Sequence, residues 1–430
     1  MASRLKSPSL QSPMLKIFQA FKYYNYRLFW FGQLISLTGT WMQMTGQAWL
    51  VLRLTTSPFA VGLVTALQTL PILLFSLFGG VFADRVPKRK FLIGTQSVAA
   101  MQALALALLV GTNLVQLWHI YILALVLGIV NAFDNPTRQA FVVEMVGRDD
   151  LPNAIALNSS LFNAARIVGP AVGGLMIATL GLADTFYANA ISFVAVIAAL
   201  VAMRPEHFFA VPTPTRGNIF RQVAEGVRYV TQTPSALAVV IVMVALGIFG
   251  YNFSVTLPLI AEFVLHTNAI GFGALTAFMG VGSLLGALAL AYQSRATYPF
   301  LLTGAAAFSV LLLSVALSSF FPVTVALLVA LGFASIAYTA TSNTLLQLNT
   351  PDHLRGRVMS IYFLLFAGST PIGGFITGAL ADSIGVPETL GIEALCCAVG
   401  VTLGIYYYNR HRPDIPTAQQ SSLLRKIYAK

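Results

Sequence analysis

The sequence predicts an all-α integral membrane protein with twelve transmembrane helices, arranged as two pseudo-symmetric halves of six. Of the 430 residues, 57% are hydrophobic and only 9% are charged, whereas charged residues make up roughly 25% of an ordinary soluble domain. Apolar runs of the length that crosses a bilayer, about 17 to 25 residues, occur twelve times. A pattern of glycine and proline in one run returns about two hundred residues later, which indicates a duplicated unit.

The predicted spans form two halves that are joined by a linker. Three prolines interrupt the chain after residue 204, and an amphipathic helix follows, which is typical of a segment at the membrane surface. The spans are expected at residues 28–52, 59–82, 91–111, 115–135, 154–179, 184–203, 236–263, 270–292, 298–320, 322–345, 358–381 and 388–408. The resulting domains are a cytoplasmic N-terminal segment 1–27, an N-terminal half 28–203, the linker 204–235, a C-terminal half 236–408 and a cytoplasmic tail 409–430.

The repeated pattern lies in the predicted fifth span. It consists of Arg166, Gly169, Pro170, Gly173 and Gly174. Proline has no N–H, so the carbonyl of Arg166, four residues earlier, loses its helical partner beside a charged side chain. Glycines four residues apart leave one face without side chains, so another helix can approach closely. The segment PIGG at 371–374 repeats PAVGG at 170–174, and same-sense repeats predict halves related by an axis along the membrane normal.

The distribution of lysine and arginine predicts the orientation. With the N-terminus inside, 23 of the 25 cations fall on the cytoplasmic side. The exceptions are Arg53, outside, and Arg166, within the bilayer. The net charge of +11 therefore reflects membrane topology, with anionic lipids as neighbours, and gives no reason to expect nucleic acid. We expect a multi-pass monomer of the plasma membrane, the inner membrane in bacteria, with both termini cytoplasmic.

The first predicted span carries a polar face. Its members are Gln33, Ser36, Thr40, Gln43 and Gln47. They are spaced three or four residues apart, so their side chains share one side of the helix, and this side cannot face lipid. Two interpretations stay open: these groups bond neighbouring helices, or they form a wall of a hydrated cavity. The candidate cavity residues are Gln43, Gln47, Asn131, Arg166, Tyr251, Asn252 and Tyr338.

The loop after the second span carries a recognisable motif. The segment GGVFADRVPKRKFL at 79–92 contains Gly80, Asp84, Arg85, Lys88 and Arg89. Their spacing resembles motif A of the major facilitator superfamily, G-x-x-x-D-R-x-G-R-K, although Pro87 stands where a glycine is usual. The resemblance implies that Asp84 and the cations brace the cytoplasmic loops against the second half and separate when the transporter changes state. A positive-inside loop would explain the cations alone, but not the Gly and Asp spacing.

A second motif indicates export. Gly169-Pro170 followed by Gly173-Gly174 resembles motif C, the GPxxGG signature of exporters in this superfamily. Nearly the whole chain resembles the branch that includes enterobactin exporters and macrolide-efflux proteins. The resemblance implies a secondary exporter of a small organic molecule that works by alternating access and proton antiport, without a cofactor. No metal site is expected either, because the two cysteines, Cys396 and Cys397, are adjacent and do not have the spacing of metal ligands.

The ionisable residues within the spans leave alternatives open. Arg166 has no matching central carboxylate, which favours an anionic or siderophore-like cargo, but it could instead be locked to Asp134 or to helix carbonyls. Asp134 lies four residues before Arg138 and can pair with it. It is expected to be either a proton carrier or a structural partner for the motif A cations. Glu262 and Glu393, near the outer helix ends, are further proton-site candidates.

Three other functions compete with export as explanations of the sequence. A lipid or lysophospholipid translocator of the same fold would also use a positive cavity, and a transport assay with defined lipids separates the two. A membrane enzyme is disfavoured because the sequence has no HExxH, GxSxG or phosphate-binding loop. A receptor that transports nothing would not need polar faces on several spans.

Overall fold

The structure is a bundle of long helices. This computed structural model describes residues 18–83, 85–210, 219–293 and 296–411, and all regular structure in that part is helical, as predicted. The unbroken membrane-length helices are α2 (Tyr24–Thr55), α3 (Pro58–Ala83), α4 (Lys88–Gly111), α5 (Leu117–Val146), α6 (Leu151–Thr179), α7 (Leu182–Ala202), α11 (Ala269–Gln293), α12 (Tyr298–Ala316), α13 (Phe321–Asn349), α14 (Asp352–Ile384) and α15 (Val386–Arg410). The seventh span is broken into α9 (Pro234–Phe249), α10 (Phe253–Leu259) and the π-helical turn η3 (Ile260–Val264).

The number of spans follows from length and hydropathy. In the described part of the chain, eleven segments are long and apolar enough to cross a membrane, and the broken seventh span counts as one of them. The remaining span is α2, which has 32 residues but low mean hydropathy because its interior carries glutamines and threonines. It packs against α6 and α7 like the other members of the bundle. The predicted twelve-span, all-α architecture therefore agrees with the structure.

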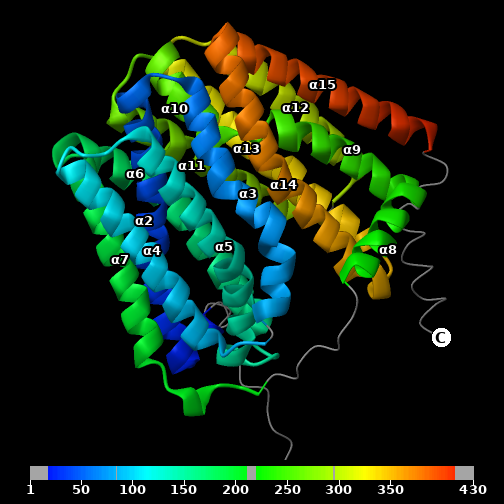
Figure 1. Cartoon of the computed structure of the whole chain (residues 1–430). Helices are drawn as coiled ribbons and strands as arrows, with labels where there is room; N and C mark the ends of the chain where they lie inside the picture. Colours follow the sequence, from blue (N-terminus) through cyan, green and yellow to red (C-terminus); the bar gives the residue numbers. More distant parts are fainter. Residues whose placement is uncertain (1–17, 84, 211–218, 294–295, 412–430) are drawn as a thin grey trace, which may run out of the picture.

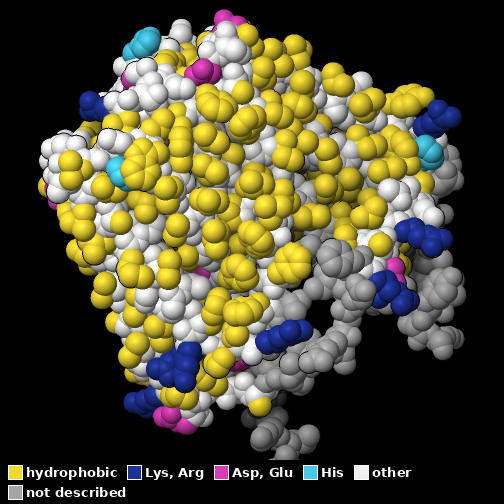
Figure 2. Space-filling model, viewed as in Figure 1, with side chains coloured by type: hydrophobic (Ala, Val, Ile, Leu, Met, Phe, Trp, Pro, Cys, Tyr) yellow, Lys and Arg dark blue, Asp and Glu magenta, His cyan; other side chains and the backbone are white. Residues whose placement is uncertain are grey.

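The two groups of helices meet at one end of the bundle. Helices α2 to α7 and α9 to α15 converge at the upper end of Figure 1 and diverge towards the lower end. We call the lower end, where residues 85–90 and 147–150 lie, the cationic end, and the upper end the far end. Figure 2 shows hydrophobic side chains over most of the visible face between the two ends, with Lys and Arg mainly at its lower and right-hand borders. This distribution is that of a protein surrounded by lipid.

Glycines bring the halves into contact at the far end. A Cβ atom on Gly62 of α3 would lie 2.5 Å from the carbonyl oxygen of Gly374 and 2.8 Å from the Cα of Gly378, both in α14. On the other side of the bundle, a Cβ on Gly174 of α6 would lie 2.5 Å from the carbonyl oxygen of Ala269 in α11. Only helices without side chains at these points can approach so closely. The far end is therefore closed by two backbone contacts between the halves.

A carboxylate also joins the halves at the far end. Asp382 of α14 accepts a hydrogen bond from the hydroxyl of Ser57 (2.7 Å) and another from the backbone N–H of Phe59 (3.3 Å). Phe59 lies in the first turn of α3, where backbone N–H groups have no helical partner. Asp382 thus caps a helix of the opposite half, and its negative charge lies at the positive end of that helix.

The repeated glycine pairs, Gly173-Gly174 and Gly373-Gly374, make equivalent packing contacts in the two halves. In the first copy, Gly173 faces Met42 of α2, the first span of its own half, and Gly174 faces α11, the second span of the other half. In the second copy, Gly373 faces the carbonyl of Ile248 in the seventh span, and Gly374 faces α3. Each pair therefore packs one glycine within its half and one across the interface, as expected of duplicated halves.

A polar cluster fixes the start of α2 to the start of α6 at the cationic end. Asp150, just before α6, accepts hydrogen bonds from the hydroxyl of Tyr23 and the ammonium group of Lys22, each at 2.6 Å. Partial burial alone would raise the pKa of the Asp150 carboxyl, but the bonds from Lys22 and Tyr23 outweigh it and hold the pKa below its ordinary value of 3.8. The stability from this cluster is therefore present above that pH and is lost as the pH falls through the lowered pKa.

The linker contributes a helix that belongs to the second half. The amphipathic helix of the linker, α8 (Ile219–Gln232), packs against α9 and the cationic end of α14. Its expected place on the membrane surface stays a prediction. Glu225 forms an ion pair with Arg357 of α14, and the Tyr229 hydroxyl donates to the carbonyl of Asn349 (2.8 Å). These bonds hold α8 on the second half. Parts of the predicted segments 1–27, 204–235 and 409–430 lie outside the described residues, so these boundaries stay predictions.

The closed far end makes a prediction about Gly62. In a variant lacking Cys396 and Cys397, the pair Ser57→Cys and Asp382→Cys should be joined by a short thiol cross-linker, because the two side chains touch. Adding Gly62→Leu should lower the yield of cross-linked protein by about an order of magnitude. The leucine side chain would overlap α14, and overpacking of this kind costs about 1–3 kcal/mol, so the closed far end would be less populated. The matched control is Gly94→Leu, because no heavy atom lies within 4 Å of a Cβ at that exposed position. Equal yields in the two leucine variants would contradict the close packing.

Candidate functional site

A cavity lies between the two halves. Its volume is about 250 Å³, and its walls come from α2, α3 and α6 of the first half and from the broken seventh span, α11 and α14 of the second. Three helices of each half therefore surround it. The cavity lies next to the closed far end. Val61 and Pro170 line the cavity, and the closing contacts are made by Gly62, the next residue of α3, and by Gly174, one turn further along α6.

Three of the predicted cavity residues line this space. They are Gln47 from α2, Arg166 from α6 and Tyr251 from the break between α9 and α10. Tyr338 and Asn252 lie behind Tyr251: the Tyr338 ring packs edge-on against the Tyr251 ring, with centroids 6.4 Å apart, and Asn252 is 1% exposed. Gln43 and Asn131, like Tyr338 and Asn252, are not among the lining residues.

The polar face of the first span is divided between two uses. Gln43 is buried and bonded inside its own half, since its amide donates to Gln102 (3.0 Å) and accepts from Asn189 (2.7 Å). One turn further along α2, Gln47 lines the cavity, and both polar atoms of its amide are buried without a partner in the described structure. The polar face is therefore divided: Gln43 bonds neighbouring helices, and Gln47 lies at the cavity, whose hydration stays a prediction.

Arg166 is the charged residue of the cavity wall. It lies fifteen residues after the start of α6 and thirteen before its end, so it is near the middle of the span. Pro170, which also lines the cavity, leaves the Arg166 carbonyl without its helical N–H. Among the residues that the structure describes, no ion pair or hydrogen bond to the Arg166 guanidinium is found, and no Asp or Glu lines the cavity.

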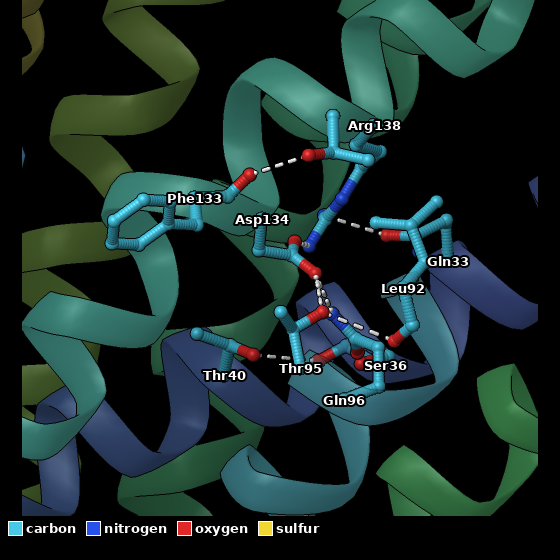
Figure 3. A network of polar contacts seen from close by, with 10 residues as sticks. Gln33, Ser36, Thr40, Leu92, Thr95, Gln96, Phe133, Asp134 and Arg138 are labelled. Carbon is cyan, nitrogen blue, oxygen red and sulfur yellow. Dashed lines mark hydrogen bonds and ion pairs between the residues drawn. The ribbon is translucent and has the colours of Figure 1, made fainter. Parts of the chain in front are cut away.

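Asp134 is part of a separate, closed network inside the first half (Figure 3). Its carboxylate is fully buried and forms an ion pair with Arg138, one turn along α5. The other oxygen accepts from the hydroxyl of Thr95 (2.6 Å) and the amide of Gln96 (2.9 Å), and Arg138 donates to Gln33 (2.7 Å). Asp134 is therefore bonded neither to Arg166 nor to a motif A cation. The structure favours a local structural pair, which is the i, i+4 pairing that the sequence allowed.

Among the acids of the second half whose burial the structure describes, Glu393 is the most buried. It is 1% exposed, in α15, and accepts a hydrogen bond from the hydroxyl of Thr377 in α14. The Asn252 side chain also interacts with it. No cation pairs with Glu393 in the described part of the chain. By contrast, Glu262 lies half-buried in the terminal π-helical turn η3.

The described motif A residues bond within the first half. Lys88, the first residue of α4, pairs with Glu144 of α5 (2.7 Å). The Arg89 guanidinium donates to the carbonyls of Leu200 (2.7 Å) and Val201 (2.6 Å), which end α7 and have no helical partner. Arg85 is exposed and Gly80 lies in the last turn of α3, while Asp84 lies outside the described residues. The predicted brace towards the second half stays a prediction.

The structure adds cavity residues that sequence reasoning missed. Trp41 and Met44 of α2, Phe253 of α10, and Phe272 and Met279 of α11 form an apolar surface around the polar groups. In a membrane protein, aromatic and methionine residues at helical spacing face lipid as readily as a cavity. Trp41 also packs at Gly169 of α6, since a Cβ on that glycine would lie 2.4 Å from the Trp41 Cβ. The cavity therefore combines a cation, an unpaired amide and a broad apolar wall.

Comparisons with known proteins agree with this arrangement. A family model described as transmembrane secretion effector matches residues 16–423. The multidrug efflux pump Tap of Mycolicibacterium fortuitum is 30% identical over 84% of this chain and 90% of its own length. The staphyloferrin A transporter of Staphylococcus aureus is 25% identical over 89% and 96% of the two chains. The macrolide efflux protein A of Streptococcus pyogenes is 24% identical over 88% and 96%.

A solved structure shows the same fold. The bacterial homolog of the human lysosomal transporter Spinster, in an inward-facing and unoccupied conformation, superposes with a TM-score of 0.73. It covers 95% of this chain and 100% of its own, at 12% identity, so the likeness concerns the fold alone.

The Asp134 network makes a prediction about stability. Asp134→Asn should lower the thermal unfolding temperature of the detergent-solubilised protein, because removing one partner of a buried ion pair costs about 3–5 kcal/mol. Adding Arg138→Gln should restore part of the loss, since the unpaired charge is then gone. Asp149→Asn, at an exposed acid near α6, is the matched control. If Asp134→Asn melted like the control, the pair would not be structural and Asp134 would be available as a proton carrier.

Proposed function

Because the chain belongs to the transmembrane secretion effector family and is an exporter of small organic molecules with the major facilitator fold, we propose that it works by alternating access and exchanges its cargo for protons. The observation that carries this proposal is the cavity between the halves, closed at the far end by glycine contacts. A transporter of this kind binds cargo between its repeats and rocks one half against the other. Arg166, Gln47 and Tyr251 are then cargo-binding residues, drawn from both halves.

The orientation proposed from the cations indicates towards which side of the membrane this conformation is open. If the cationic end faces the cytoplasm, the closed far end is the extracellular side and the halves diverge towards the cytoplasm (Figure 1). The structure would then be a loading state for an exporter, in which cargo enters the cavity from inside. Opening to the outside requires separation of the Gly62 and Gly174 contacts and of the Asp382 cap.

In the same cycle, motif A would close the cationic end when the far end opens. In a state that diverges at the cationic end, Lys88 and Arg89 bond to α5 and α7 of their own half. We propose that Asp84 and Arg85 engage the second half when the cationic end closes. Glu225 and Arg357 hold α8 on α14 and give the second half a polar surface at that end.

We propose Glu393 as the proton site. A carboxylate that is buried without a cation is costly, so the neutral, protonated acid is the form that such a site favours. Asp134 does not have this property, because Arg138 compensates its charge. Asn252, the neighbour of Glu393, follows the cavity residue Tyr251 directly in the break of the seventh span. A change of charge at Glu393 can therefore reach the cavity through one short, irregular segment.

The surroundings of the protein follow from the proposed orientation. We propose a plasma-membrane protein, in the inner membrane of a bacterium, that works as a monomer with both termini in the cytoplasm. Anionic lipids of the cytoplasmic leaflet would contact the cationic end. The relatives include a siderophore transporter and drug efflux pumps, and these names support small organic molecules as cargo without choosing between them.

The proton site is tested with Glu393→Gln. This change keeps the shape and hydrogen-bonding capacity but removes the titratable group, so cargo exchange at equal pH on both sides should persist in proteoliposomes. Transport driven by a pH gradient should fall to the level of protein-free vesicles. Glu388→Gln, at an exposed acid in the first turn of α15, should leave both rates unchanged. Gradient-driven transport at the normal rate in Glu393→Gln would show that the proton is carried elsewhere.

A further inference from the structure

The chemistry of the cavity wall is specific enough to name a class of cargo. The first element is Gln47, which is 2% exposed and has neither its amide oxygen nor its amide nitrogen bonded in the described structure. The other buried amides that leave an atom without a partner in the described structure are Gln96, Gln102 and Asn252, and each of them keeps one hydrogen bond through its other polar atom. A buried polar group without a partner is unfavourable. A molecule in the cavity that offers both a hydrogen-bond acceptor and a donor would satisfy Gln47.

The second element is the positive charge. Arg166 lines the cavity without an anionic partner among the described residues, and the lining contains no acid. A guanidinium presents a planar set of donors that fits a carboxylate with two parallel hydrogen bonds. An organic cation placed beside Arg166 would meet a like charge and no compensating carboxylate. The site is thus arranged to accept negative charge and to disfavour positive charge.

The third element is the apolar wall. Trp41 from the first half and Phe253 and Phe272 from the second line the space, together with Met44 and Met279. Aromatic rings favour flat, apolar partners, and methionines adapt to irregular shapes. With a volume of about 250 Å³, the space is large enough for one compact ring system. The aromatic lining favours a ring compound as the ligand.

Together these elements define a ligand. We infer that the cavity binds an aromatic organic anion, with its acidic group at Arg166, its ring between the apolar walls, and a hydroxyl or amide group at Gln47. The inference rests on the proposed function only in taking this cavity as the cargo site. Arg166 provides the charge selectivity, and Gln47 distinguishes aromatic acids that carry a further polar group from those that do not.

The test is equilibrium binding to the purified full-length protein in detergent, with four matched naphthalene probes. They are 2-naphthoate, 2-naphthamide, 2-naphthylmethylammonium and 6-hydroxy-2-naphthoate. The anion should bind about tenfold or more tightly than the neutral amide, because a charge-assisted bidentate contact is lost in the latter. The ammonium probe should bind more weakly still. The hydroxylated acid should bind several-fold more tightly than 2-naphthoate.

Variants assign each preference to a residue. Arg166→Gln should remove the preference for 2-naphthoate over 2-naphthamide, and Arg166→Lys should restore only part of it, because an ammonium group cannot reproduce the planar fork. Gln47→Leu should leave that preference and remove the gain from the added hydroxyl. Arg53→Gln is the control, since this arginine is exposed at the end of α2 and does not line the cavity.

Two results would overturn the inference. One is equal or tighter binding of the amide or ammonium probe by the unaltered protein, which needs no variant and so cannot be confused with misfolding. The other is an anion preference that survives Arg166→Gln. Because binding is measured without a gradient or vesicles, it is separable from export: selective anion binding without transport would leave this inference standing and remove the proposed function.

Discussion

Hydrocarbon cannot hydrogen-bond, so every polar side chain within a span must find a partner in the protein or face an aqueous space. This constraint sorts the polar residues of the chain into two sets. Asp134, Arg138 and Gln43 are bonded inside the first half and stabilise its packing. Gln47 and Arg166 have no such partners in the described structure and line the cavity between the halves. The unpaired set therefore locates the site where cargo would complete the bonding.

Alternating access also requires an interface between the halves that can close and open without disturbing the packing inside either half. Glycine provides it, because Gly62 and Gly174 allow backbone contacts with α14 and α11, and contacts of this kind separate without moving side chains out of pockets. Each contact lies beside a cavity wall, so closing the far end and shaping the cavity are one event. Pro170 frees a carbonyl next to Arg166 at the same place, which gives α6 a point of bending.

Much of the fold could be predicted because its signals are local. Apolar runs give the spans, and the Pro and Gly repeat gives the duplication, since both depend on properties of one helix. The division of the polar face of α2 could not be predicted, because Gln43 and Gln47 have the same residue type and lie one turn apart. Their difference comes from Gln102 and Asn189 on other helices. The pair of Asp134 and Arg138 could be predicted, because both residues lie on one helix, four residues apart. That Arg166 lines the cavity could not, because it depends on how the helices of both halves pack around it.

The central claim is that the two halves rock about the cavity, so that one end opens as the other closes. It is tested most directly by pulsed electron resonance distances between spin labels on exposed residues, Arg148 with Gly356 at the cationic end and Thr112 with Ser383 at the far end. Between an acidified sample and a neutral one containing 2-naphthoate, the account predicts opposite changes, with one distance shortening as the other lengthens. Distances that stay fixed at both ends, or that lengthen together, would contradict it.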